Sequence, residues 1–189
     1  RAIDLIDFKE ILNISGQLFL AVGLMWISSL ISFDFNGIVL PISLQSMTAI
    51  LLPLIFRGNI GVIAVALYLV LGALGVPMFA GGLGGWKYIQ STSGGYLIGF
   101  LIVAFLTSLV KNWIKGKNGF IISFLIFIAM HAVLTASGLS WLHINSIDVS
   151  FSVHVSPFMP GTVIKSIIGA TIAEVVRFYY LKKTTDSLS

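Results

Sequence analysis

The sequence predicts an all-α integral membrane protein with six transmembrane helices, both termini in the cytoplasm, and an irregular glycine-rich outer loop between the third and fourth helices. Hydrophobic residues make up 57 % of the chain and charged residues only 10 %, whereas a soluble domain carries about 25 % charged residues. The apolar residues form long runs separated by turn signals, and basic residues gather in alternate connections. At this length we expect one membrane domain over residues 1–189.

The residue types exclude several classes of function. The absence of cysteine removes disulfides, thiolate catalysis and cysteine metal sites, and the three histidines lack the spacing of metal ligands. The net charge of +4 gives no case for a nucleic-acid partner. No nucleophile elbow, carboxylate pair or Walker motif is present. We therefore expect no enzyme, no cofactor and no metal, and an ATP-driven pump would need other subunits.

The first two predicted spans cover residues 14–32 and 43–56. The first contains small residues, which let helices approach closely in lipid, and we expect them to pack within the bundle. The second is bounded by Pro41 and interrupted by Pro53, so its helix is only about 20 Å long and too short to cross a bilayer alone. Short, proline-interrupted spans point to transporter binding sites. Gln45 in this span is either a ligand hydrogen-bonder or a link between helices.

The third and fourth spans, residues 61–75 and 95–110, flank a glycine-rich segment from Pro77 to Gly99. Seven of its 23 residues are glycine, which disfavours helix and permits positive φ and close backbone approach. Irregular backbone at membrane depth is tolerated only where protein buries it or where it lines a cavity. The segment is therefore either part of a ligand site or an extramembrane loop with turns.

The last two predicted spans, residues 120–136 and 157–181, are separated by a polar loop over 136–156. We expect Trp141 in this loop to lie at the membrane interface. His131, inside the fifth span, is more typical of a hydrogen-bonded structural residue than of a ligand. The sixth helix begins either at Ser156-Pro157, with proline in its first turn, or after Pro160-Gly161.

The basic residues predict the orientation of the chain. In a six-span arrangement only Lys87 falls in an outer connection. The positive-inside rule then places both termini in the cytoplasm, and the glycine-rich loop with the loops over 33–43 and 136–156 outside. The inner basic residues are Arg1, Lys9, Arg57, Lys111, Lys115, Lys117, Arg177, Lys182 and Lys183.

Lys165 is the basic residue left over, and it lies inside the sixth span among apolar neighbours. A lysine there costs about 2.5 to 3.5 kcal/mol on insertion scales, so it is either paired inside a cavity or extended outward to the interface. Because an ammonium only donates hydrogen bonds, a cavity lysine suits a carboxylate or a carbonyl. Glu174 and Arg177 lie three positions apart near the other end of this helix, which indicates a structural pair or a partner contact.

Four segments resemble one family. ISLQSM at 42–47 resembles a PVTLQT-type motif, YLVLGALGVPMFAGGLGG at 68–85 resembles YLLLGAIGLPVFAGG, STSGGYLIGF at 91–100 resembles GPTGGYLIGF, and SPFMPGTVIK at 156–165 resembles PFIPGDLIK. Together, and in this order, they are similar to BioY, the substrate-binding S component of energy-coupling factor (ECF) biotin transporters. The resemblance covers residues 14–181.

The resemblance implies a high-affinity biotin site open to the outside, in a multi-pass protein of a prokaryotic plasma membrane. It implies partners in a transmembrane T component and two ATPases, which power uptake. It also implies that Lys165 bonds the head group of biotin, that Gln45 and Tyr96 shape the pocket, and that Ser93 with backbone amides near Gly81 binds the carboxylate. The full set of expected biotin-binding residues is Lys165, Thr162, Gln45, Tyr96, Ser93, Gly81, Gly82 and Trp86, the last either covering the rings or lying at the interface.

Three departures from the family pattern bear on these expectations. The usual aspartate before the lysine is Thr162, which can accept an N–H but leaves Lys165 without its expected counterion. The motif glycine and proline are Ser91 and Thr92. The small residues that S components use in the first span to meet the T component are incomplete here, because Ala21 is followed four positions on by Met25. An S component for another vitamin and a membrane scaffold without transport function stay open as alternatives.

Overall fold

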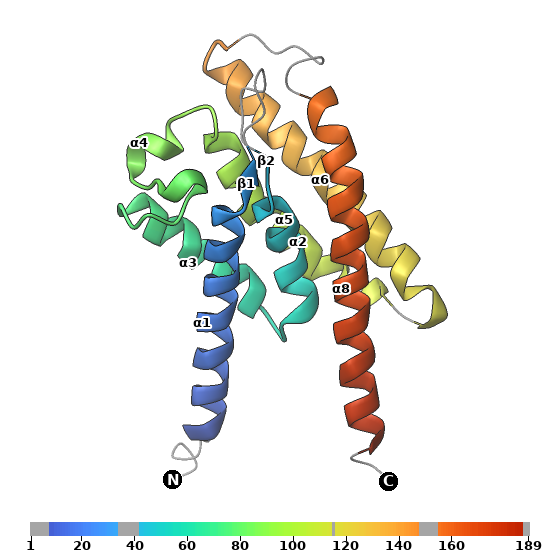
Figure 1. The fold of residues 1–189 in the computed structure, drawn as a ribbon. Coiled ribbons are helices and arrows are strands. Elements are labelled where there is room, and N and C mark those ends of the chain that lie inside the picture. The colour runs from blue at the N-terminus through green and yellow to red at the C-terminus, as the bar shows by residue number, and fades with distance from the viewer. Residues whose placement is uncertain (1–7, 34–41, 115, 148–154, 187–189) are drawn as a thin grey trace.

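The computed structural model describes residues 8–33, 42–114, 116–147 and 155–186 as a bundle of helices (Figure 1). The long helices are α1 (Phe8–Leu30), α2 (Gln45–Ile55), α3 (Ile60–Ala73), α5 (Gly94–Val110), α6 (Gly119–Ile144) and α8 (Met159–Asp186). Short helical turns fill the connections: η1 (Ala80–Gly82), α4 (Trp86–Ile89), η2 (Lys111–Trp113), η3 (Gly116–Asn118) and η4 (Ser156–Phe158). The α1 and α2 helices are joined through a short antiparallel pair, β1 (Ser32–Phe33) with β2 (Ile42–Ser43), which the sequence did not predict.

The two chain ends and the connection that contains α4 lie in opposite halves of the bundle. The start of α1 and the end of α8 lie at the same end in Figure 1, and the connection that contains α4 lies in the opposite half. Within the described residues, four helices are long and apolar enough to cross a membrane, and α2 and α3 are shorter apolar helices. At 1.5 Å per residue, α2 is about 16 Å long and α3 about 21 Å long, short of a hydrocarbon core of about 30 Å. The all-helical membrane class is therefore supported, with four helices of spanning length.

The outer surface of the bundle is apolar, as expected of a protein that faces lipid. Phe19 on α1 is 85 % exposed, and Val175 and Phe178 on α8 are also exposed. Scattered exposed apolar residues are normal in soluble proteins, but large contiguous apolar surfaces are not. These side chains therefore indicate contact with acyl chains.

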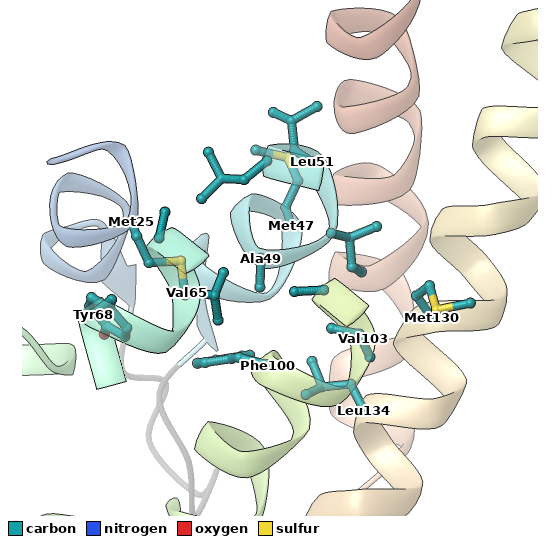
Figure 2. Packing of buried hydrophobic residues seen from close by; sticks show 14 of the residues in the cluster. Met25, Met47, Ala49, Leu51, Val65, Tyr68, Phe100, Val103, Met130 and Leu134 are labelled. Carbon is teal, nitrogen blue, oxygen red and sulfur yellow. The ribbon is translucent and has the colours of Figure 1, made fainter. Parts of the chain in front are cut away.

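The core is built where α1, α2, α3, α5 and α6 meet (Figure 2). Met25, Val65 and Tyr68 pack on the side of α1 and α3, and Phe100, with others, packs toward α5 and α6. Met130 belongs to the same cluster. Because this packing fixes α2 from several sides, the start of α2 is held firmly in the interior of the bundle.

The expectation that residues 136–156 form a loop is wrong over its first part, because α6 continues to Ile144. Ser137 donates a hydrogen bond to the Gly95 carbonyl at 2.8 Å, and Gly138 lies directly behind the Tyr96 ring. The small polar residues that suggested a loop are instead those that let α6 pack closely against α5. Trp141 belongs to this helix, and its indole N–H donates to the Ser91 carbonyl at 2.9 Å.

The last helix begins with a 3₁₀ turn, η4, which has proline in its first turn and leads directly into α8. The first of the two expected starts is therefore nearer to the structure, although Val155 and not Ser156 occupies the N-cap position. Pro160 and Gly161 lie in the first turn of α8, where proline costs no hydrogen bond because the first amides have no partner.

Part of the small-residue face of α1 packs inward, whereas Ser15 and Gly16 near the start of the helix are exposed. Ala21 and Met25 are both fully buried, and Ser28 is bonded to the Met25 carbonyl at 2.7 Å. These positions therefore belong to the core, as expected of small residues in a bundle, and they are covered from outside partners. The Trp26 indole N–H on the neighbouring face donates to the Pro77 carbonyl at 3.1 Å and ties α1 to the start of the glycine-rich segment.

Several expectations fall on parts of the chain outside the described residues. These parts are residues 34–41 and 148–154 of two predicted outer loops, and the positions of Arg1, Pro41 and Lys115; the side chains of Lys9, Lys117, Lys182 and Lys183 are likewise not described.

Candidate ligand-binding site

A cavity lies where the starts of α2, α5 and α8 meet the middle of α6, closed on one side by η1 and α4. Its volume is about 90 Å³, where one water needs about 10 to 15 Å³, so it has room for a small ring system. Its lining is mostly apolar with a few polar groups, which is typical of small-molecule sites. The lining residues are Ser43, Gln45, Ser46, Ala80, Tyr88, Ser93, Tyr96, Leu97, Phe100, His131, Leu134, Thr135, Phe158, Thr162 and Lys165.

Gln45 lies at the start of α2, where its side chain is fixed at both ends. Its amide oxygen accepts a hydrogen bond from Ser43 at 2.9 Å, and its amide N–H group donates to the Tyr68 hydroxyl on α3. Gln45 is 4 % exposed and lines the cavity. It is therefore a link between α2 and α3, and its remaining N–H is held in one orientation at the cavity wall.

Lys165 points into the cavity and does not extend outward. Its ammonium donates to the Ser46 hydroxyl at 2.8 Å and lies 3.4 Å from the Ser43 carbonyl. Both acceptors are neutral, and Lys165 forms no ion pair within the described part of the chain. The cation is therefore held by α2 while its charge is not cancelled there.

Ser46 connects Lys165 to His131. The Ser46 oxygen lies 3.3 Å from His131 Nε2, and His131 Nδ1 lies 2.9 Å from the Phe127 carbonyl. Because an ammonium only donates, Ser46 accepts from Lys165 and turns its own proton toward Nε2. His131 is then the neutral tautomer that carries its proton on Nδ1 and donates it to Phe127. This chain of bonds orients the ammonium, and it gives His131 the structural role that the sequence favoured.

Tyr96 adds a polar group that none of the described residues satisfies. Its hydroxyl is buried and has no hydrogen-bond partner among the described residues, and Tyr96 lines the cavity. A buried hydroxyl without a partner costs about 1 to 3 kcal/mol. A ligand with a donor or an acceptor at this point of the cavity would recover that cost.

The first part of the glycine-rich segment, before Ser93, contributes different residues from those expected. Ala80 and Tyr88 line the cavity, whereas Gly81, Gly82 and Trp86 are not among the residues that do. Gly81 and Gly82 both have positive φ, and the Gly82 amide donates to the Phe79 carbonyl at 3.0 Å. Trp86 is 62 % exposed on α4. The structure thus brings together five of the eight expected residues: Lys165, Thr162, Gln45, Tyr96 and Ser93.

Sequence reasoning missed Ser43 and Ser46, which hold Gln45 and Lys165 in place. Both serines flank Gln45 in the segment at 42–47, which could have drawn attention to them, but their contacts depend on the tertiary structure. Phe100 and Phe158 also line the cavity and lie in two of the quoted motifs, but an apolar side chain in a motif does not by itself indicate a cavity wall.

The fold is an apolar helical bundle, and the Lys165 ammonium and the Tyr96 hydroxyl face a small cavity inside it. This combination is typical of a membrane protein that binds a small molecule. Among the described residues no histidine or carboxylate cluster could hold a metal ion. The chain belongs to the BioY family, whose model matches residues 9–182. The resemblance seen in the motifs is thereby confirmed.

Comparisons with known proteins agree with this membership. The chain is 30 % identical over 156 residues to the probable biotin transporter BioY of Pyrococcus horikoshii, which covers 82 % of this chain and 90 % of that protein. It is 32 % identical over 135 residues to the biotin transporter BioY of Thermotoga maritima, covering 70 % and 78 %. The crystal structure of the S-component for biotin from an ECF-type ABC transporter has the same fold, with a TM-score of 0.79 at 24 % identity, covering 90 % of this chain and 93 % of that one. The family is one of transporters and not of enzymes.

Proposed function

We propose that this protein is the biotin-binding S component of an ECF-type transporter and mediates biotin uptake in a prokaryote. The observation that carries the proposal is Lys165, a cation directed into a small cavity by neutral groups alone. A ligand that accepts hydrogen bonds from this ammonium would complete the site. The relatives of this chain named as biotin transporters supply the identity of that ligand.

The bicyclic head of biotin fits the chemistry of the cavity. Its ureido carbonyl would accept from Lys165, and an adjacent ureido N–H would donate to the Thr162 hydroxyl. The Tyr96 hydroxyl, which lacks a partner among the described residues, would bond the remaining polar edge. Leu97 and Phe100 offer an apolar wall for the sulfur side of the rings.

The tail of biotin would leave the cavity past the start of α5. There we assign the carboxylate to the Ser93 hydroxyl and to the backbone amide of Gly81, with Trp86 covering the opening from α4. The Gly82 amide already donates to Phe79, so Gly82 would contribute through its backbone conformation alone. Ser93 lines the cavity itself, whereas the other contacts require the tail to reach beyond it. Helix starts favour anions, which supports a carboxylate beside the first turn of α5.

The proposed orientation has six spans in the plasma membrane with both termini in the cytoplasm. The charge distribution supports it, because Arg57, Lys111 and Arg177 come together around one crevice. The chain has no native cysteine, so single cysteines can be labelled without background. A membrane-impermeant thiol reagent should label Lys87→Cys in intact cells and should label Asn118→Cys only after the cells are opened. The reverse pattern would overturn the orientation.

We propose a transmembrane T component and two ATPases as partners for energy-driven uptake. Labelled biotin uptake should be measured in cells that contain this chain with and without those subunits. Uptake that is equal in both cases would contradict the need for partners while leaving biotin binding intact.

The binding experiment tests the ligand directly. The purified protein in detergent should bind labelled biotin saturably, and unlabelled biotin but not other vitamins should displace it. Displacement by a different vitamin would assign the site to that vitamin, which Thr162 in place of the family aspartate makes worth testing. Binding that stays undetectable at micromolar biotin would overturn the proposal and favour a scaffold.

A further inference from the structure

A second hollow lies beside the ends of α2 and α5, at the end of the bundle opposite the ligand cavity. This crevice has a volume of about 540 Å³. Four elements that are distant in sequence surround it, so it is a product of the fold and not of one loop. Its lining residues are Leu54, Ile55, Phe56, Arg57, Gly58, Lys111, Asn112, Ile114, Ser123, Ala173, Val176 and Arg177.

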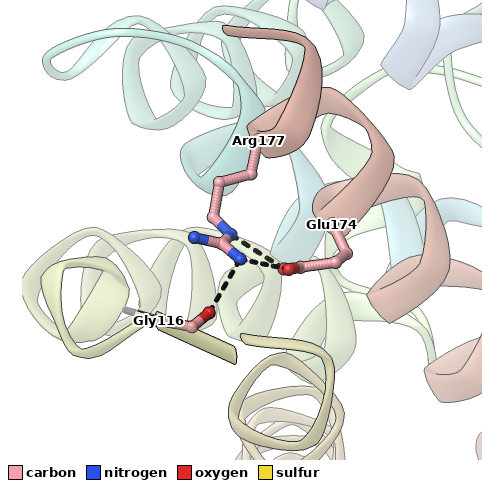
Figure 3. Close-up of polar contacts among 3 residues, drawn as sticks. All are labelled: Gly116, Glu174 and Arg177. Atoms are coloured by element: carbon pink, nitrogen blue, oxygen red, sulfur yellow. Dashed lines mark hydrogen bonds and ion pairs between the residues drawn. The ribbon is translucent and has the colours of Figure 1, made fainter. Parts of the chain in front are cut away.

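The polar part of the crevice is cationic. Arg57, Lys111 and Arg177 line it, and none of the described residues that do so is acidic. Arg177 is already paired with Glu174 and bonded to the Gly116 carbonyl at 3.1 Å (Figure 3). Lys111 donates to the Gly58 carbonyl at 2.6 Å, which brings the ends of α5 and α2 together. Arg57 and Lys111 therefore supply positive charge that no carboxylate in the described lining cancels.

Ser123 gives a second and independent sign of a ligand. Ser123 on α6 is fully buried and lines the crevice, yet its hydroxyl has no hydrogen-bond partner within the described residues. A serine hydroxyl in a helix often bonds the carbonyl four residues earlier, but the Ser123 hydroxyl does not. A buried hydroxyl that has no partner costs free energy. A ligand oxygen in the crevice would provide that partner.

The depth of the crevice fits the boundary between lipid tails and head groups. Leu54, Phe56 and Ile114 give it an apolar floor. Trp113, 68 % exposed, lies next to the basic lining, and indole rings favour the head-group level of a bilayer. The exposed surface of α8 continues past the crevice with Phe178. A ligand in this position would have acyl chains beside an apolar surface and a charged head beside the cations.

We propose that this crevice binds an anionic phospholipid, with its phosphate between Arg57 and Lys111, an oxygen within reach of Ser123, and its acyl chains along the apolar floor. Basic pockets between transmembrane helices on the cytoplasmic side commonly take such head groups. The floor selects a lipid over free phosphate, which has nothing to place there. The site is separate from the biotin cavity, so this inference does not depend on the identity of the transported ligand.

The test is native mass spectrometry of the purified protein with phosphatidylglycerol and, separately, with phosphatidylcholine of the same chain length. We expect phosphatidylglycerol to be retained preferentially. Arg57→Gln and Lys111→Gln should each weaken its binding about fivefold, which corresponds to about 1 kcal/mol per cation. Because Lys111 also donates to the Gly58 carbonyl, the melting temperature of each variant is measured beside its lipid binding, and an unchanged value shows that the fold is kept. Lys87→Gln, which removes one charge outside the crevice, is the matched control and should have no effect.

Ser123→Ala gives a finer test against Ser166→Ala. Both serines are fully buried with no partner in the described part of the chain, but Ser166 lines neither hollow. Ser123→Ala should weaken phosphatidylglycerol binding severalfold, and Ser166→Ala should leave it unchanged. Equal retention of both lipids, an equal loss in Lys87→Gln, or displacement of the lipid by millimolar inorganic phosphate would overturn the proposal. The proposal would also be overturned if Arg57→Gln and Lys111→Gln retained the lipid but no longer assembled with partner subunits. The crevice would then be a contact with another protein.

Discussion

Two cations on α8 have the same local sequence arrangement and opposite surroundings. Arg177 follows Glu174 by three positions, and Lys165 follows Thr162 by three positions, about 18 Å away along the helix. At the first position the pair is ionic and both side chains are 25 % exposed. At the second the acidic member is replaced by threonine, and the cation reaches across to a serine of α2.

The difference teaches what each cation can do. Arg177 donates hydrogen bonds to Glu174 and to the Gly116 carbonyl, so it connects α8 to the turn before α6 (Figure 3). Lys165 is oriented by groups that do not neutralise it, so its charge stays directed at the cavity. One helix thus carries a structural cation at one end and the proposed binding cation at the other, and the residue three positions earlier decides whether the cation has an ion-pair partner on its own helix.

Lys165→Ala should give the largest effect. It removes the charged donor, and we expect biotin affinity to fall at least a hundredfold, because hydrogen bonds to charged groups are strong when the site excludes water. The melting temperature should change little, since Ser46 keeps its contact with His131. Binding of labelled biotin and thermal unfolding of the same samples measure both. A variant that binds normally would remove Lys165 from the site.

Ser46→Ala should come next, with a loss of affinity of about tenfold. The ammonium would lose the acceptor that orients it, while its charge would stay in the cavity. Thr48→Ala is the matched control, because Thr48 is also buried on α2 but bonds only the Leu44 carbonyl of its own helix. An equal loss in both variants would point to a general weakening of α2.

Thr162→Asp makes the two ends of α8 alike. The carboxylate would stand three positions before Lys165, as Glu174 stands before Arg177, and it would accept a ureido N–H as a charge-assisted bond. We expect biotin to bind about fivefold more tightly. Thr162→Asn, similar in size but uncharged, should bind as the wild type does. Equal tightening in both variants would show that shape and not charge is responsible.

Glu174→Gln should have the smallest effect and on stability alone. Ion pairs at this exposure contribute about 0.2 to 1 kcal/mol, so the melting temperature should fall by a few degrees at most. Biotin affinity should stay unchanged because the pair lies at the other end of α8. A clear loss of affinity would mean that the two ends of the helix are coupled.

The helices were predictable wherever an apolar run ended at a strong turn signal. Spans three and four agree with α3 and α5 closely, because Gly75 and Lys111 mark their ends. The end of α6 was not predictable, because small residues such as Ser137 and Gly138 are common both in loops and where two helices pack closely. Their role depends on Gly95 and Tyr96, which only the tertiary structure places beside them.

The site was predictable in its charged and motif-borne members and not in their supports. Lys165 was evident because a lysine inside a span is costly and needs a reason. Ser46 was not, because the contact that matters joins it to residues 85 and 119 positions away. The departures at Gly81, Gly82 and Trp86 have a similar cause, since motif similarity places a segment near a site without saying which of its residues face inward.

The buried Tyr96 hydroxyl and the uncancelled charge of Lys165 have a consequence for the thermodynamics of the whole chain. Each is a cost that the folded protein carries until something fills the cavity. A ligand that binds only the folded form adds RT ln(1 + [L]/Kd) to its stability, which is about 2.7 kcal/mol at a hundred times Kd. The melting temperature of this protein should therefore rise with ligand concentration, so that it can serve as a measure of ligand occupancy.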